Sequence, residues 1–164
     1  MSKLFSFPNP ANDTSARIVA TGVVAMSIVF LVTGSGWVLI PLTYGFVARV
    51  LTGPTLSPLG QLSVKVITPL IKVNHKLVAG PPKRFAQGVG TAFSVVASIL
   101  YLADNLTASR IVIAMLTAAA SLEAFLGYCL GCKMFAMLMR LGIIPESVCA
   151  ECNDISLRIR AQQS

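Results

Sequence analysis

Charged residues are scarce in this chain of 164 residues, because only 12% of them are Asp, Glu, Lys or Arg. A soluble globular domain carries roughly 25%. Apolar residues make up 55% of the chain, and the mean hydropathy is +0.77. The shortage of charge argues against a free-standing soluble enzyme. The abundance of apolar residues excludes disorder, which requires low hydrophobicity. At this length we expect one domain.

Acidic and aromatic residues are few as well. Six Asp and Glu stand against 13 Lys and Arg, giving a net charge of +7, and aromatic residues make up 7%. A nucleic-acid-binding protein would interleave its basic residues with polar surface. Here the basic residues lie between long apolar blocks, as in membrane proteins. We therefore expect membrane lipid around the chain and no nucleic-acid partner.

Three blocks are almost free of charge: residues 18–48, 85–103 and 111–132, the last interrupted only by Glu123. One membrane span needs about 20 apolar residues. The first block is too long for one helix and contains Thr33-Gly34-Ser35-Gly36, a turn signal. The sequence therefore predicts four spans, over residues 17–32, 37–51, 85–103 and 108–132.

The distribution of basic residues predicts the orientation. Six of them lie between the last turn of the second span and the start of the third: Arg49, Lys65, Lys72, Lys76, Lys83 and Arg84. The positive-inside rule places this segment in the cytoplasm. Four spans bring both basic termini to the same side, whereas three would not. The polar segment 1–16 does not resemble a secretory signal, and residues 141–164 form a predicted cytoplasmic tail.

Residues 58–73 are predicted to form an amphipathic helix on the cytoplasmic surface. Ser57 is the expected N-cap and Pro58 the first helical residue. Apolar side chains recur every three or four residues, with lysines on another face, which is typical of a helix lying on an anionic leaflet. The expected fold is thus all-α, a four-helix transmembrane bundle with a surface helix. Asn105, in an Asn-Leu-Thr sequon, is interpreted as a helix cap, and His75 as a solvated loop residue.

All four cysteines fall in the last third, as two C-x-x-C pairs: Cys129 with Cys132, and Cys149 with Cys152. Three interpretations stay open. The pairs are catalytic thiols of redox or sulfur-transfer chemistry, or ligands of one structural zinc ion, or small residues that pack between helices. The predicted compartment is reducing, which argues against a permanent disulfide.

The helix dipole distinguishes the two pairs. Cys129 and Cys132 are expected to close a long helix, where the dipole disfavours a thiolate. Cys149 follows Pro145, a helix-start signal, so a helix N-terminus is expected to favour its thiolate.

Glu123 is the one acid well inside a predicted span, which makes it a candidate functional residue. It is expected to face another helix, either as a paired packing residue or as part of a proton or ion relay. Lys83 and Arg84 open the third span. They are either membrane-interface residues or, with His75, an anion-binding site near the thiols.

Four segments together resemble a bacterial integral-membrane family known as domain of unknown function 4395. They are Thr33 to Trp37, Gly53 to Pro58, Pro82 to Ala86, and Glu123 to Cys132, and the resemblance covers most of residues 12–140. It implies a small multi-helix protein of the bacterial inner membrane, and it carries over Lys83, Arg84, Glu123, Cys129 and Cys132. It also implies an association with thioredoxin-like or rhodanese-like sulfurtransferase proteins.

The leading functional prediction is a cytoplasm-facing thiol or sulfur relay that needs no cofactor. Cys129 and Cys132 would form the membrane-embedded dithiol, Cys149 and Cys152 a tail dithiol that exchanges with it, and Lys83 and Arg84 would hold an anionic sulfur donor. The alternatives are an accessory or scaffold subunit whose four cysteines bind zinc, and a transporter of a small sulfur species. A homo-oligomer or a larger membrane complex is expected in either case.

Overall fold

The computed structural model describes residues 11–53, 55–70 and 77–149. The regular structure in this part of the chain is helical except for one short antiparallel pairing of β1 (Ala11–Asn12) with β2 (Leu77–Val78). The helices in order are α1 (Asp13–Thr33), η1 (Gly36–Val38), α2 (Leu39–Thr52), α3 (Pro58–Leu62), the π-helix η2 (Ser63–Ile67), α4 (Thr68–Leu70), α5 (Gly80–Leu102), α6 (Leu106–Leu126), α7 (Leu130–Arg140) and η3 (Glu146–Cys149). The predicted all-α class is confirmed.

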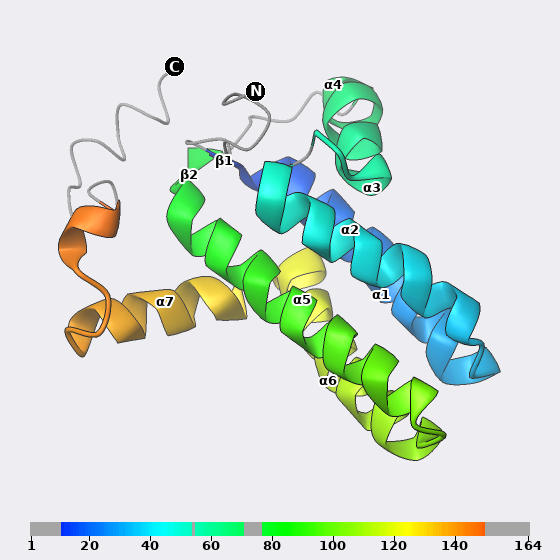
Figure 1. Cartoon of the computed structure of the whole chain (residues 1–164). Helices are drawn as coiled ribbons and strands as arrows, with labels where there is room; N and C mark the ends of the chain where they lie inside the picture. The colour runs from blue at the N-terminus through cyan, green and yellow to red at the C-terminus, as the bar shows by residue number, and fades with distance from the viewer. Residues whose placement is uncertain (1–10, 54, 71–76, 150–164) are drawn as a thin grey trace.

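Helices α1, α2, α5 and α6 lie side by side, with α1 against α6, α2 against α5, and α5 against α6 (Figure 1). Tight turns reverse the chain between α1 and η1, where Gly34 has a φ of 66°, and between α5 and α6, where Asp104 has a φ of 58°. The predicted turn at Gly34 is confirmed. The predicted helix cap at Asn105 is also confirmed, because its side chain accepts a hydrogen bond from the Ala108 N–H at 3.1 Å.

These two reversals place four helix termini at one end of the molecule. The starts of α1 and α5 meet the ends of α2 and α6 there, and Asp13, Arg49, Lys83 and Glu123 all belong to those termini. We call this end the polar end. The opposite end, with the two tight turns, is the turn end.

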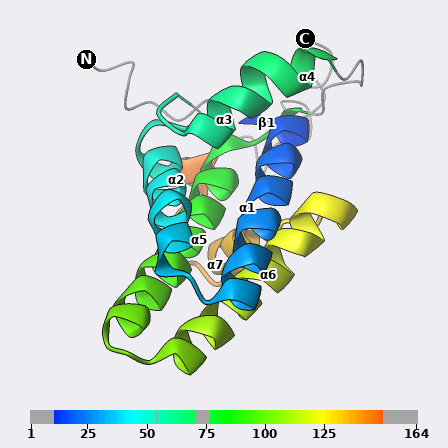
Figure 2. The ribbon, with the colours of Figure 1, turned by 90° about the vertical axis from the view of Figure 1, so that its right-hand side faces the viewer.

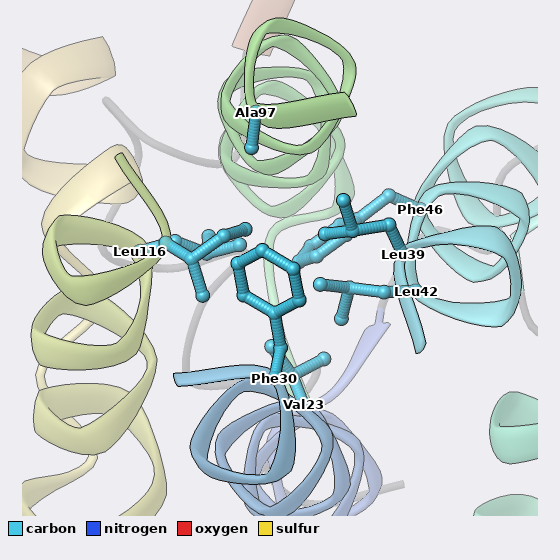
Figure 3. Packing of buried hydrophobic residues seen from close by; sticks show 8 residues of the cluster. Val23, Phe30, Leu39, Leu42, Phe46, Ala97 and Leu116 are labelled. Atoms are coloured by element: carbon cyan, nitrogen blue, oxygen red, sulfur yellow. The ribbon is translucent and has the colours of Figure 1, made fainter. Parts of the chain in front are cut away.

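A compact apolar core holds the four helices together. Phe30 of α1 is fully buried and points into the space between the helices, as Figure 3 shows. Side chains from all four helices surround it: Val23, Leu39, Leu42, Phe46, Ala97, Ile113 and Leu116. These apolar side chains fill the space between the four helices. The charged side chains of these helices therefore lie near the helix ends.

Gly90 allows α5 to approach α2. A Cβ at this position would collide with the ring of Phe46 on α2. Small residues at such crossings let helix backbones come close, which is a common device in membrane helices. The contact matters for the site because Arg49 follows Phe46 by one helical turn on the same face of α2.

The outer faces of the helices are apolar. Trp37 and Leu102 each expose 81% of their surface, and Val32 exposes 76%. Helices α1, α5 and α6 are each long and apolar enough to cross a membrane. Their 21 to 23 residues reach about 32 to 35 Å, against a hydrocarbon core of about 30 Å. The segment Gly36–Thr52 is a shorter apolar helix.

The segment from α3 to α4 lies across the ends of α1 and α2 (Figure 2). Its predicted N-cap is confirmed, because the Ser57 hydroxyl accepts a hydrogen bond from the Gly60 N–H. The amphipathic helix predicted over residues 58–73 is interrupted by the π-helix η2. Pro69 provides the reason, since its ring clashes with the carbonyl four residues earlier and opens the helical turn before it. The predicted residues 71–73 lie outside the described residues.

The prediction for the end of the fourth span is wrong. The helix was expected to continue to Cys132, but α6 ends at Leu126. Gly127 adopts the left-handed conformation with a φ of 65°, and Tyr128 N–H bonds back to the Leu122 carbonyl. This is the geometry of a glycine-terminated helix. Cys129 then begins α7, which runs across the direction of α5 (Figure 1).

Candidate functional site

The Cys129–Cys132 pair lies at the start of a helix, not at the end of one. Cys129 is the N-cap of α7, and its sulfur accepts a hydrogen bond from the Cys132 N–H at 3.3 Å. The two sulfurs are joined as a disulfide. A helix N-terminus stabilises a thiolate through its free N–H groups and its dipole. The position of Cys129 therefore reverses the electrostatic expectation from the sequence.

Helix α7 is fixed against the start of α5. A Cβ on Gly131 would lie 2.5 Å from the Cβ of Ala86 and 2.6 Å from its Cα, so the two backbones are in close contact. Farther along α7, the buried Phe135 packs on Phe85 with 5.7 Å between ring centres. These contacts hold the disulfide near the polar end, beside the first turns of α5.

Lys83 forms a buried ion triad with two carboxylates at the polar end. Its Nζ lies 2.9 Å from Asp13 Oδ1 and 2.7 Å from Glu123 Oε1. The Lys83 side chain exposes 6% of its surface, and the two carboxylate side chains expose 16% and 15%. One ammonium group thus joins α1, α5 and α6.

Arg49 is the second buried cation at this end. The residue exposes only 5% of its surface. Its Nε donates to Gln87 Oε1 at 3.0 Å, and its guanidinium carbon lies 4.6 Å from the centre of the Phe46 ring. Neither terminal nitrogen has a hydrogen-bond partner among the described residues.

Two more arginines at the polar end bind helix C-termini. Arg17 on α1 donates to the carbonyls of Ala124 and Phe125 at 3.4 and 3.0 Å. Arg84 on α5 donates to the Val50 carbonyl at 3.0 Å. The last carbonyls of a helix lack intrahelical partners, so each arginine ties one helix end to a neighbouring helix.

The structure brings the predicted site residues to one end but changes their relations. Glu123 faces a neighbouring helix as predicted, and its partner is Lys83. Lys83 and Arg84 have protein partners, so their anion-binding role stays a prediction. Asp13 was not predicted as part of the triad, and Arg49 was predicted only as one of the basic residues between the second and third spans. The sequence signal that could have identified both residues is their position, because each lies one helical turn or less from the end of a span that reaches the polar end.

Only part of the second cysteine pair, Cys149 and Cys152, belongs to the described residues. The backbone of Cys149 belongs to η3, while its side chain and all of Cys152 lie outside the described residues, as does His75. In the part of the chain that the structure describes, no group of three or more His, Cys, Asp or Glu is placed to hold a metal ion. The four-cysteine zinc site therefore stays a prediction.

Comparison with known proteins gives one match. Residues 11–140 match a family model described as "Domain of unknown function (DUF4395)". The match covers all four long helices, α7, and every residue of the triad. No curated protein and no solved structure matches the chain.

Proposed function

The chain belongs to the DUF4395 family, and we propose that this member is a membrane-embedded thiol–disulfide exchange protein whose reactive pair is Cys129 and Cys132. One observation carries the proposal. The pair closes a disulfide at a helix N-terminus, where the first cysteine is the N-cap. That is the environment in which a thiolate is stabilised and exchange is fast.

The proposed setting is the bacterial inner membrane, crossed four times. Helices α1, α5 and α6 supply three spans, and η1 with α2 supplies the fourth. The 17 residues of Gly36–Thr52 lie at the lower limit of about 17 to 25 for a span. Helix ends alternate between the polar end and the turn end, so four crossings return the chain to the side from which it started.

The polar end is proposed to face the cytoplasm, with the α3–α4 segment on the membrane surface. Arg17, Arg49, Lys83 and Arg84 all gather at this end, and Lys65 lies exposed on η2. The positive-inside rule assigns such an end to the cytoplasm. The disulfide would then lie in a reducing compartment, where bonds of this kind serve exchange rather than permanent cross-linking.

The proposed reaction transfers two electrons from a partner dithiol, such as that of a thioredoxin-like protein. A partner thiolate attacks Cys129, forming a mixed disulfide and releasing the Cys132 sulfur, which takes up a proton. The second thiol of the partner then attacks the partner's sulfur in the mixed disulfide, which forms a disulfide within the partner and releases Cys129. The partner is oxidised to a disulfide, and Cys129 and Cys132 are reduced to thiols. The reverse sequence reoxidises them, and the tail pair Cys149 and Cys152 is a candidate for that exchange.

The test is to trap the mixed disulfide in cells. Cys132→Ser leaves Cys129 as a single thiol, whose thiolate attacks the disulfide of an oxidised partner, as in the reverse reaction, and releases one partner thiol. Because Cys132 is absent, this chain cannot resolve the mixed disulfide, which accumulates and is identified by non-reducing electrophoresis and mass spectrometry. An adduct to Cys149 or Cys152 would identify the tail as the partner. Reduction and reoxidation of the wild-type protein in defined thiol buffers would show a two-electron equilibrium.

Cys149→Ser is the matched control, because it removes one thiol of the other pair. Introduced together with Cys132→Ser, it should leave an intermolecular Cys129 adduct unchanged. The proposal fails if Cys132→Ser gives no adduct in the presence of its partners, or if the Cys129–Cys132 bond in the wild-type protein cannot be reduced. Stoichiometric zinc on all four cysteines would also contradict it.

A further inference from the structure

Arg49 presents an unusual combination of burial and missing partners. The residue is 5% exposed, and Nε is its only guanidinium nitrogen with a hydrogen bond among the described residues. Buried guanidinium groups ordinarily make several hydrogen bonds, because a buried donor without an acceptor costs about 1–3 kcal/mol, and more when it is charged. The Phe46 ring covers one face of the group but provides no acceptor in its plane.

We propose that Arg49 anchors a binding site for a small oxyanion at the polar end. The two terminal nitrogens of a guanidinium form a rigid fork that matches two oxygens on one centre, as in a carboxylate, sulfate or phosphate group. The proposal goes beyond thiol–disulfide exchange, which requires no anion, and it stands independently of the cysteines.

Two neighbours of Arg49, Gly45 and Gln87, bear on the proposed site. Gly45 lies one turn earlier on α2, and a Cβ there would be 3.8 Å from both terminal nitrogens. A glycine at this position keeps the flank of the fork free of a methyl group. On the other side, Gln87 holds Nε and so fixes the plane of the guanidinium.

The nearby carboxylates do not occupy the fork. Glu123 and Asp13 are both bound to Lys83, at 2.7 and 2.9 Å, and no ion pair joins either to Arg49 in the described part of the chain. Lys83 offsets much of their charge where they lie. The triad of one lysine and two carboxylates keeps one net negative charge, so the ligand expected at Arg49 is a small oxyanion of low charge.

Binding can be measured on the full chain in a non-ionic detergent that contains no phosphate. Sodium sulfate and sodium acetate are titrated against sodium chloride at equal ionic strength, and the unfolding temperature and the heat of binding are recorded. Wild-type protein should show saturable binding of at least one of the two anions. Arg49→Gln should remove it, and Gly45→Ala should weaken it at least about tenfold by placing a methyl group beside the fork.

Two comparisons separate binding at Arg49 from general effects of salt and charge. Sulfate stabilises proteins without binding them, so only the difference between wild type and Arg49→Gln counts. Arg140→Gln removes an exposed arginine at the end of α7 and should keep the binding. If Arg49→Gln does not fold, Gly45→Ala carries the test. Equal responses of wild type, Arg49→Gln and Gly45→Ala, or no saturable response of the wild type, would overturn the proposal.

The same assay identifies the source of the ligand. Inorganic phosphate represents an anion from solution, and short-chain phosphatidic acid represents a lipid headgroup. Binding of the first alone assigns a soluble ligand. Binding of the second alone assigns a lipid phosphate that enters from the membrane surface. Both results support an oxyanion site and require Arg49.

Discussion

Lys83 shows how a single residue can organise one end of a membrane protein. Asp13 and Glu123 come from opposite parts of the chain, and both bind the same ammonium group. A carboxylate within a membrane helix is costly unless it is paired. The triad offsets that cost by placing one cation between two anions at the helix ends, where α1, α5 and α6 meet.

Replacing Lys83 should therefore destabilise the protein strongly. Lys83→Met leaves two neighbouring half-buried carboxylates without their cation, so the loss should lie toward the lower end of the about 3–5 kcal/mol that removal of one partner from a buried pair costs. Thermal or denaturant unfolding in detergent measures the loss.

Lys65→Met is the matched control, because Lys65 is an exposed lysine on η2, and its change should be below about 1 kcal/mol. The variant that combines Lys83→Met with Asp13→Asn and Glu123→Gln should recover much of the stability. Equal stability of Lys83→Met and Lys65→Met would show that the triad contributes nothing.

At the scale of elements, the junction between α6 and α7 decides where Cys129 and Cys132 lie. Gly127 ends α6 in a left-handed conformation, and Arg17 caps the last carbonyls of the same helix. Helix α7 then turns across α5, with Gly131 pressed against Ala86. The cysteines are thus placed by the conformation of Gly127, by the hydrogen bonds of Arg17, and by the contact with Ala86 of Gly131, which lies between the two cysteines.

A methyl group on Gly131 should push α7 away from α5. Its Cβ would come within 2.6 Å of the Ala86 backbone, which cannot yield as a side chain would. Overpacking of this kind costs about 1–3 kcal/mol. Gly131→Ala should lower the unfolding temperature and raise the rate at which the Cys129–Cys132 bond is reduced.

Gly88→Ala provides the matched comparison on α5. A Cβ at Gly88 meets nothing within 4 Å, so this substitution should stabilise the helix by about 0.5–1 kcal/mol. A loss of stability in Gly88→Ala that equals the loss in Gly131→Ala would refute the proposed contact between α7 and α5.

At the scale of the whole molecule, the two ends differ in kind. The polar end gathers the ion triad, Arg49 and the disulfide, whereas the turn end consists mainly of the reversals at Gly34 and Asp104. With apolar outer faces between them, the molecule has the form expected of a protein that exposes its chemistry on one side of a membrane.

The proposed orientation can be checked by labelling single cysteines in intact cells, in a background where the four native cysteines are serine. Ser35→Cys and Thr107→Cys, at the turn end, should react with a membrane-impermeant maleimide. Thr55→Cys and Leu141→Cys, on the other side, should react only after the membrane is opened. Labelling of Ser35→Cys and Thr55→Cys from the same side would contradict four crossings.

Local signals in the sequence were sufficient for several features of the fold. The N-caps at Ser57 and Asn105 and the turn at Gly34 depend on neighbouring residues, so the sequence predicted them correctly. The end of α6 was missed, although Gly127 carried the signal. The apolar run up to Cys132 suggested one span, and the left-handed glycine ended the helix against that periodicity.

The candidate site was predictable in its members but not in its pairings. Glu123 stood out because an acid is rare in a span, and the cysteines because of their spacing. Nothing in the spacing indicated that Lys83 would reach Asp13, or that the nitrogens of Arg49 would stay without acceptors. Such relations depend on which helix ends meet, and they join residues far apart in the chain.

The sequence by itself determined the helical class, the length of the apolar segments and the accumulation of positive charge near particular helix ends, because these follow from composition and local periodicity. The tertiary structure alone decided that Cys129 caps a new helix, that one lysine serves two carboxylates, and that Arg49 is buried with two nitrogens that lack acceptors among the described residues. The physical reason is that a charge is stabilised by what surrounds it in space, and only packing brings those surroundings together.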